Sequence, residues 1–404
     1  MSYVREKLNR NRVNGLLRVD GRRMVNGVGE EVLLAGWGLG NWLLCEGYMW
    51  LAHDLPGFDR PRRIEAVIAE LAGEDYAASF WPRFRANYIA EKDFEMMAQM
   101  GYNSVRIPIN ARLFVEEAPG VRFRREGFEC LDRALDWCEK HRLYAFIDLH
   151  GAPGGQTGAN IDDSVDDVCH LLTDDEQFEK GVELWKEIAQ RYKNRWIVGG
   201  YDLLNEPVRP VRFEGDKSLE HCVPRLVEFY EECIARIRAT GDNHIVTLEG
   251  HHWATETAIF THSYDPQMVV HFHRYWCPPD MTAFEPWLVL SERLNAPLWL
   301  GETGENTIEW FNKMIPLALS LDIGVNMWPW KKMNCINSPC SVTPPEDWQT
   351  LLDGARGVEH PRREKAQALL EAYLENMRAE NCRLNEDVAA CAFPDEYTHA
   401  FVRS

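Results

Sequence analysis

Two glutamates follow short apolar runs of the same form. The segment 201–207 (YDLLNEP) ends its run with an amide, a carboxylate and a proline, and the segment 298–304 (LWLGETG) carries a carboxylate after its own run. Such runs form buried parallel strands, and proline cannot continue their hydrogen-bond ladder. We therefore expect Glu206 and Glu302 at the carboxyl ends of two strands, where α/β barrels hold their chemistry.

Two carboxylates that face one space are suited to glycoside hydrolysis with retention. One attacks the anomeric carbon while the other protonates the leaving oxygen, and the two stand roughly 5 to 5.5 Å apart. A nearby cation can keep the first carboxylate ionised, and polar and aromatic groups can orient or stack on a sugar. The residues of these types at predicted strand ends are Arg106, His150, Asn205, His271, His273, Tyr275, Trp328 and Trp330.

The elements that would position these residues alternate along the chain. Apolar runs predict strands over 31–37, 104–108, 144–150, 200–204, 244–249, 268–273, 298–301 and 324–328. Helical periodicity fills the spaces between most of them, over 91–100, 127–141, 174–192, 218–240, 286–294 and 307–321, and returns over 361–381, which we interpret as the last barrel helix. Strands that alternate with helices predict a parallel sheet, and eight of them predict a closed (β/α)8 TIM barrel.

Two decorations are expected on this α/β barrel. Turn pairs between residues 13 and 34 predict small hairpins that plug the bottom of the barrel. A long insertion after strand one, residues 46–88, is expected over the barrel mouth, where Trp42 and Glu46 are candidates for contact with a substrate. With neither repeat nor low-complexity linker, we expect one domain over 1–404 with the barrel core at about 30–380.

Composition narrows the class of partner. The formal net charge of -19 lacks the basic footprint of a protein that binds nucleic acid or an anionic membrane, so a neutral substrate is expected. The 15 tryptophans exceed what a core alone usually needs and suit stacking on sugars. Eleven scattered cysteines without a CxxC pair, and a charged N-terminus without an apolar core, predict a cytoplasmic protein with reduced thiols.

Two other kinds of site are disfavoured by spacing. Gly38 and Gly40 do not complete a GxGxxG phosphate loop. His150, His271 and His273 could ligate a metal, but strand one lacks the His-x-His pair from which a mononuclear barrel hydrolase draws ligands. We predict neither metal nor cofactor.

Six segments in order resemble glycoside hydrolase family 5, a family of retaining (β/α)8 β-glycosidases. They are 104–109 (SVRIPI), 148–154 (DLHGAPG), 203–207 (LLNEP), 273–275 (HRY), 301–302 (GE) and 330–331 (WK), and the likeness covers about residues 30–335. The resemblance implies that Glu206 is the acid/base and Glu302 the nucleophile. It further implies a supporting shell at Arg106, His150, Asn205, His273 and Tyr275 and a sugar platform at Trp330.

The segment 36–43 (GWGLGNWL) with Glu46 is similar to the exo-acting β-1,3-glucanase branch, whereas 303–304 (TG) and 328–331 (WPWK) depart from it. The family also holds β-mannosidase-like enzymes. The resemblance thus implies an exo-acting β-glycosidase that takes a terminal glucose or mannose from a short neutral oligosaccharide. The alternatives are an endo-β-glucanase or mannanase, and an inactive carbohydrate-binding barrel. The oligomeric state is not predicted.

Overall fold

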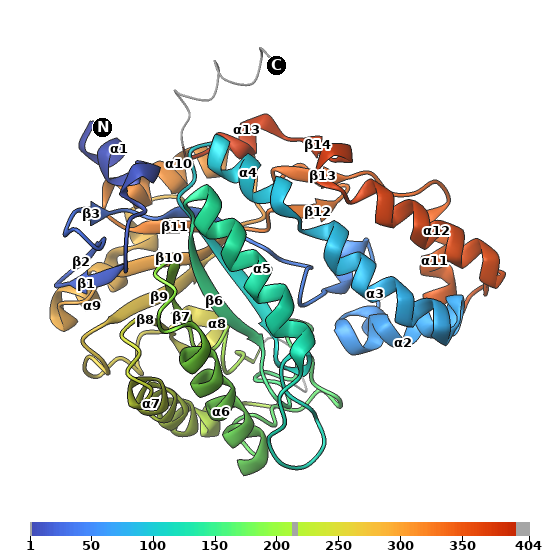
Figure 1. The fold of residues 1–404 in the computed structure, drawn as a ribbon, viewed down its shortest axis with the longest axis horizontal. Coiled ribbons are helices and arrows are strands. Elements are labelled where there is room, and N and C mark those ends of the chain that lie inside the picture. Colours follow the sequence, from blue (N-terminus) through green and yellow to red (C-terminus); the bar gives the residue numbers. More distant parts are fainter. Residues whose placement is uncertain (1, 212–216, 393–404) are drawn as a thin grey trace.

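Eight parallel strands close into a barrel in the order β10-β11-β4-β5-β6-β7-β8-β9 (Figure 1). The computed structural model describes residues 2–211 and 217–392 of the 404-residue chain. The barrel strands are β4 (Ala35–Gly38), β5 (Ser104–Asn110), β6 (Tyr144–Gly151), β7 (Val198–Asp202), β8 (Ile245–Glu249), β9 (Met268–Arg274), β10 (Leu298–Gly304) and β11 (Gly324–Trp328). The predicted (β/α)8 barrel is confirmed.

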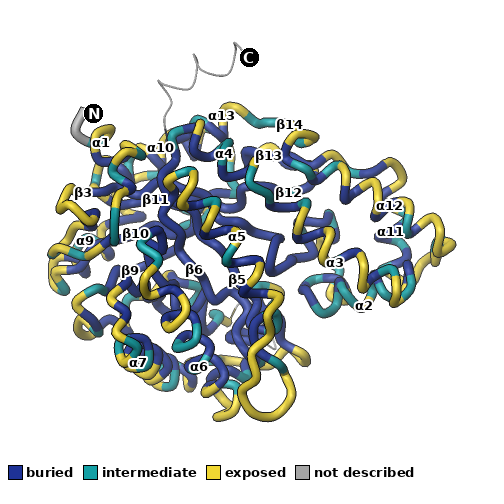
Figure 2. Tube along the Cα trace, viewed as in Figure 1, coloured by how far each residue is buried: buried dark blue, intermediate teal, exposed yellow. Residues whose placement is uncertain are grey.

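Helices surround this barrel because each has one apolar face to bury. They are α4 (Glu91–Gln99), α5 (Arg125–His141), α6 (Asp175–Tyr192), α7 (Val223–Ala239), α9 (Glu285–Leu294) and α10 (Ile308–Ser320). The short segment α8 (His251–Ala254) after β8 contains left-handed backbone angles and is not one of the covering helices. In α5, for example, Leu131, Leu135 and Cys138 recur at helical spacing and are buried. Every position of β5 and β6 is buried, as expected for parallel strands covered on both faces (Figure 2).

Strand ends differ from prediction where the catalytic candidates stand. The strand predicted over 200–204 ends as β7 at Asp202, although Asn205 N–H still donates to the Leu149 carbonyl at 3.1 Å. Glu206 therefore lies on a short segment beyond the strand. The strand predicted over 298–301 continues as β10 to Gly304, so that Glu302 lies inside it. The register between β10 and β9 shifts between Leu300 and Glu302, which brings Glu302 opposite His273.

The N-terminal segment covers the bottom of the barrel, as predicted. The strand expected over 31–37 divides in two: β3 (Glu31–Val32) joins β1 (Arg18–Asp20) and β2 (Arg23–Val25) in an antiparallel sheet, and β4 starts the barrel. Helix α1 (Ser2–Leu8) packs on β3. Tyr144, at the amino end of β6, donates its hydroxyl to the Gly15 carbonyl at 2.8 Å, which anchors the plug below the strands.

The inserted helices form a side layer with the C-terminal helices. The insertion holds α2 (Pro61–Ala72) and α3 (Glu74–Tyr88), and beside them lie α11 (Trp348–Ala355) and α12 (Arg363–Asn376) at one end of the molecule (Figure 1). The helix predicted over 361–381 thus forms, but it packs on α2 and α3 instead of completing the barrel wall. Aromatic contacts stabilise this packing, because the Tyr373 ring of α12 lies 6.1 Å from that of Phe84 in α3 and 4.9 Å from that of Trp50, between ring centroids.

A small sheet connects this layer to the barrel. It consists of β12 (Lys331–Met333), β13 (Cys340–Val342) and β14 (Arg383–Leu384), followed by the single turn α13 (Glu386–Ala389). All eleven cysteines carry free thiols. Within residues 2–211 and 217–392, none of the helices has the length and apolarity needed to cross a membrane. The one-domain organisation over 1–404 stays a prediction, because 212–216 and 393–404 lie outside the described residues.

A buried ion pair fixes the connection between barrel and side layer. Lys331 Nζ lies 2.7 Å from Asp93 Oδ1 of α4, and both side chains are fully buried. The same ammonium group donates to the Met377 carbonyl just after α12 at 3.1 Å. Because Asp93 also accepts the indole N–H of Trp330 at 2.8 Å, one carboxylate serves two buried donors.

Removal of that carboxylate should destabilise the whole chain. We expect Asp93→Ala to lower the free energy of unfolding by about 3 to 5 kcal/mol, since it leaves a buried ammonium group without its counter-charge. Urea denaturation followed by circular dichroism measures this loss. Glu95→Ala on the same helix removes an exposed partner of Lys92 and should leave the transition almost unchanged. Equal transitions for the two variants would contradict the structural role of the buried pair.

Candidate active site

Glu206 and Glu302 face one cavity at the carboxyl end of the barrel. The cavity has a volume of about 720 Å³, and both side chains line it. A carboxylate oxygen of Glu206 and one of Glu302 lie within 4.8 Å of each other. Glu206 adopts a left-handed backbone conformation with φ of 44°, and the Glu249 carboxylate accepts its backbone N–H at 2.6 Å. The two glutamates predicted from distant segments are therefore brought together.

Arg106 lies below the two glutamates, fully buried on β5. Its Nη1 donates to Glu302 Oε2 at 2.5 Å, its Nε to Asp202 at 2.8 Å, and its Nη2 to the Asn205 side-chain oxygen at 2.8 Å. Nη2 also lies 3.1 Å from Glu249 and 3.2 Å from Asp148. One guanidinium thus compensates four buried carboxylates, the arrangement that a planar, always charged donor permits.

The positive charges around Glu302 keep it ionised. Burial alone would raise the pKa of Glu302, but the charges of His273 and Arg106 outweigh burial and hold the pKa below its usual value. Tyr275 donates its hydroxyl to Glu302 Oε1 at 2.7 Å, which favours the same charged form. Glu302 therefore has the protonation state that a nucleophile requires.

His273 connects the two glutamates. Its Nδ1 lies 2.7 Å from Glu206 Oε1 and 3.9 Å from Glu302 Oε1. Burial opposes a charged imidazole here, but Glu249 and Glu302 outweigh burial and raise the pKa of His273 well above its usual value. Tyr275 and His273, both predicted for the site, line the cavity as expected.

His150 and Asn205 contact each other at the carboxyl ends of β6 and β7. The Asn205 amide lies 3.3 Å from His150 Nε2, while His150 Nδ1 lies 2.8 Å from Asp148. His150 lines the cavity. Asn205 and Arg106 do not line the cavity. Their side chains are hydrogen-bonded to each other, and Asn205 also contacts His150.

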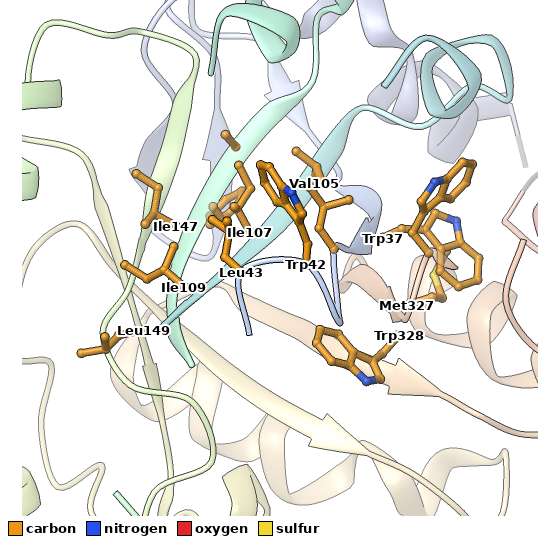
Figure 3. Close-up of a cluster of buried hydrophobic side chains, with 14 of the residues drawn as sticks. Trp37, Trp42, Leu43, Val105, Ile107, Ile109, Ile147, Leu149, Met327 and Trp328 are labelled. Carbon is orange, nitrogen blue, oxygen red and sulfur yellow. The ribbon is translucent and has the colours of Figure 1, made fainter. Parts of the chain in front are cut away.

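The structure corrects two of the predicted tryptophan contacts. Trp330 is fully buried, contacts Trp37 with ring centroids 6.4 Å apart, and donates to Asp93 away from the cavity. Trp42 is part of the buried hydrophobic cluster and donates its indole N–H to the Arg85 carbonyl at 2.8 Å (Figure 3). Trp328 lines the cavity instead, stacked on His150 at a centroid distance of 5.2 Å and an interplanar angle of 5°.

The first part of the insertion, residues 46–59, forms one wall of the cavity. It contributes Glu46, Tyr48, Ala52, His53, Asp54, Leu55, Pro56 and Asp59. Glu46 lines the cavity, and its contact with a substrate stays a prediction. Burial, followed by the charges of Glu302 and Glu305, raises the pKa of Glu46 well above its usual value. A neutral carboxyl group thus shares the cavity with the ionised Glu302.

Three buried carboxylates of the site escaped prediction. Asp148, Asp202 and Glu249 stand inside the apolar strands β6, β7 and β8, and each contacts Arg106. Their signal in the sequence was an acidic residue within a run that is buried on both faces. Such a residue needs a buried partner, and Arg106 was the buried cation available.

Three groups of side chains in the described part of the chain have spacings that could hold a metal ion. Among the described residues, potential ligand atoms lie within 4.8 Å of one another in Glu220-His251-His252, Glu249-His271-His273 and Glu206-His273-Glu302. The last two sets surround Arg106, whose guanidinium contacts Glu249 and Glu302 directly. The fixed positive charge of Arg106 would repel a metal cation bound to Glu249 or Glu302. That the protein uses neither metal nor cofactor stays a prediction.

A closed (β/α)8 barrel with paired carboxylates at the carboxyl ends of its strands defines the class of barrel glycoside hydrolases. The sequence model of Cellulase (glycosyl hydrolase family 5) matches residues 71–334. The chain belongs to glycosyl hydrolase family 5, which confirms the resemblance in the sequence.

Three characterised relatives illustrate the range of this similarity. The β-xylosidase of Phanerodontia chrysosporium is 30% identical over 244 residues, 60% of this chain and 48% of that protein. Endoglucanase C of Acetivibrio thermocellus is 24% identical over 300 residues, 61% and 85% of the two chains. The glucan 1,3-β-glucosidase of Candida oleophila is 32% identical over 190 residues, 44% and 43%. The chain therefore spans less than half the length of the β-xylosidase and the glucosidase.

Solved structures share the fold. An endogalactoceramidase superposes with a TM-score of 0.58 and 18% identity, over 90% of this chain and 84% of that chain. The β-mannanase of Thermomonospora fusca superposes with a TM-score of 0.50 and 16% identity, over 79% and 86%. At these identities the likeness extends to the barrel architecture.

Replacement of Arg106 should destabilise the protein in a pH-dependent manner. In the wild type, the pKa values of Asp202 and Glu302 lie below their unfolded values, so both stabilise the fold above about pH 4. In Arg106→Met the folded pKa values of the buried carboxylates rise, which costs about 3 to 5 kcal/mol near neutral pH. Protonation should relieve part of that cost.

Denaturation at about pH 7.5 and about pH 5 shows how much of the lost stability comes from unpaired carboxylates. The loss of unfolding free energy relative to the wild type should be smaller at the lower pH. Arg83→Met, which removes a half-exposed partner of Glu371, is the control. An equal loss for Arg106→Met at both pH values would show that its carboxylate partners are not the cause.

Proposed function

We propose that the protein is a retaining β-glycosidase that removes a terminal sugar from short neutral oligosaccharides. The observation that carries this proposal is the approach of Glu206 and Glu302 within 4.8 Å across one cavity, with Arg106 and Tyr275 bound to Glu302. Inverting enzymes separate their carboxyl groups by roughly 6.5 to 9.5 Å to admit a water molecule, so the short separation favours a covalent intermediate.

The roles follow from the surroundings of each glutamate. Glu302, held ionised, attacks the anomeric carbon, and the bond to the leaving oxygen breaks as Glu206 donates its proton to that oxygen. Glu206, now a carboxylate, accepts a proton from water, and the hydroxyl oxygen displaces Glu302 from the sugar. His150 and Trp328 line the cavity beside the anomeric centre in this arrangement, where they orient the ring, and Asn205 contacts His150 from behind.

Exo action is supported by the segment 46–59 after β4, which forms one wall of the cavity. A wall built by an insertion on one side of the catalytic pair suits the end of a chain better than its middle. The endoglucanases among the relatives keep endo action as the alternative.

Three sugars are candidates for the terminal residue that is removed. Relatives named as glucan 1,3-β-glucosidases and a β-xylosidase suggest a β-glucoside or β-xyloside, and the earlier sequence-based expectation adds a β-mannoside. Glucose and mannose differ at the 2-hydroxyl, which we expect near Asn205. We also propose a cytoplasmic location on the strength of the eleven free thiols.

A panel of aryl β-xyloside, β-glucoside and β-mannoside tests the function and selects the sugar. We expect turnover of at least one, and a loss of kcat by about a thousandfold or more in Glu302→Gln, which cannot form the covalent intermediate. A rapid fall in the viscosity of a β-glucan polymer reports endo action, because exo action releases reducing ends without shortening the chains quickly. Tight oligosaccharide binding with no turnover anywhere in the panel would identify an inactive binding barrel instead.

Leaving-group dependence tests the acid role of Glu206. In Glu206→Ala, the rate of sugar transfer to Glu302 should fall steeply for alkyl or sugar leaving groups and little for dinitrophenolate, which departs without a proton. Pre-steady-state release of the phenol measures that step. Added azide should restore turnover by replacing the water that no longer has a base. A uniform loss across leaving groups would assign Glu206 another role.

A further inference from the structure

His271 is a fully buried residue of β9 that lies behind the cavity, outside its lining. Its Nδ1 is 3.0 Å from Asp202 Oδ1. Asp202 is held by Arg106 through Oδ2 and by the Thr247 hydroxyl through Oδ1, at 2.8 Å each. Burial would raise the pKa of Asp202, but its contacts with His271, Arg106 and Thr247 outweigh burial and keep the pKa below the usual value. An ionised carboxylate only accepts, so His271 Nδ1 must carry a proton.

The second nitrogen of His271 is therefore an acceptor. Burial lowers the pKa of His271 to about 4, which leaves the ring neutral with its single proton on Nδ1. Its Nε2 lies 3.1 Å from Nε2 of His273. Because one nitrogen must donate to the other, the proton in this contact belongs to His273. Glu249 Oε1 lies 3.3 Å from the same His273 nitrogen.

Because Nε2 of His273 donates to His271, the remaining nitrogen, Nδ1, is the one that contacts Glu206. With a proton fixed on Nε2, His273 offers Nδ1 either as a lone pair to a protonated Glu206 or as an N–H to an ionised one, across 2.7 Å. Either state places one proton between Glu206 Oε1 and His273 Nδ1. The opposite tautomer of His273, with Nδ1–H and a bare Nε2, would set two lone pairs against each other at His271.

We propose that Asp202 and His271 are positioning residues that hold a proton on Nε2 of His273 and so keep the acid proton on the Glu206–His273 pair. The inference rests on the proposed acid role of Glu206. During sugar transfer, that one proton passes to the leaving oxygen as the glycosidic bond breaks, and a proton from the incoming water later restores it. The titratable groups that face the two histidines are Arg106, Asp202, Glu206, Glu249 and Glu302.

The neighbouring strand leaves room for the His271 ring only because it has a glycine at position 301. A Cβ atom at Gly301, on the neighbouring strand β10, would lie 2.0 Å from His271 Nε2. Only glycine leaves the imidazole in this place. Gly301 directly precedes Glu302, at the register shift that aligns Glu302 with His273. The same local irregularity therefore admits the histidine and presents the nucleophile.

Nitrogen-15 NMR of the histidine-labelled wild type tests the tautomers without reference to activity. We expect a neutral Nδ1–H ring for His271 and a proton on Nε2 of His273, assigned by the signals lost in His271→Phe and His273→Phe. A neutral Nε2–H ring for His271 would overturn the inference. If either variant fails to fold, long-range proton–nitrogen correlations in the wild type still show whether a buried Nδ1–H ring exists.

Kinetics of His271→Phe then test the consequence. This variant keeps the ring shape but loses both nitrogens, so kcat/KM for alkyl or sugar leaving groups should fall at least about tenfold more than for dinitrophenolate. His244→Phe is the matched control, since His244 is an equally buried histidine whose Nδ1 lies 2.8 Å from Asp242 at the amino end of β8. It should leave the leaving-group dependence unchanged.

The NMR and kinetic results distinguish a failure of the proposed glycosidase function from a failure of the proposed role of His271. A wild type that is inert on every aryl glycoside refutes the proposed function, while the NMR result still decides the tautomers. An active wild type in which His271→Phe and His244→Phe show the same leaving-group dependence refutes the positioning role of His271.

Discussion

The burial of Arg106 is the constraint on which the active-site end of the barrel depends. A guanidinium with no exposed surface loses several kcal/mol of hydration, and this cost is offset only if its donors are satisfied by well-placed acceptors. Here the acceptors come from β6, β7, β8 and β10 and the segment after β7. Closure of the barrel is what brings them within reach, so the fold and the charge arrangement require each other.

The charges around Arg106 also give neighbouring carboxyl groups different protonation states. Glu302 and Glu46 line the same cavity, yet the charges of His273 and Arg106 lower the pKa of Glu302, whereas burial and the Glu302 charge raise the pKa of Glu46. Neighbouring acids with opposite shifts can act as a nucleophile and as a neutral hydrogen-bonding group in one solvent. The distinction arises from position relative to Arg106, since the two side chains are chemically identical.

Sequence patterns predicted the barrel and the two glutamates because both depend on local signals. An apolar run buried on both faces, ended by a proline or a glycine, marks a strand and its carboxyl end within a few residues. The partners of Arg106 depend on strands that are distant in sequence, so Asp148, Asp202 and Glu249 were missed. The side layer was missed for the same reason: helix 361–381 was predicted, but its contact with α2 and α3 was not.

Strand geometry explains why Trp328 lines the cavity and Trp330, the predicted sugar platform, does not. In a continuous strand, residues two apart point to the same face, so a sugar platform at one position would imply the same face for the other. Strand β11 ends at Trp328, and the chain turns into β12 at Lys331. Beyond that turn the side-chain alternation of β11 no longer applies, and Trp330 points to Trp37 and Asp93. The residue that contacts the cavity is thus the last one whose direction the barrel strand still controls.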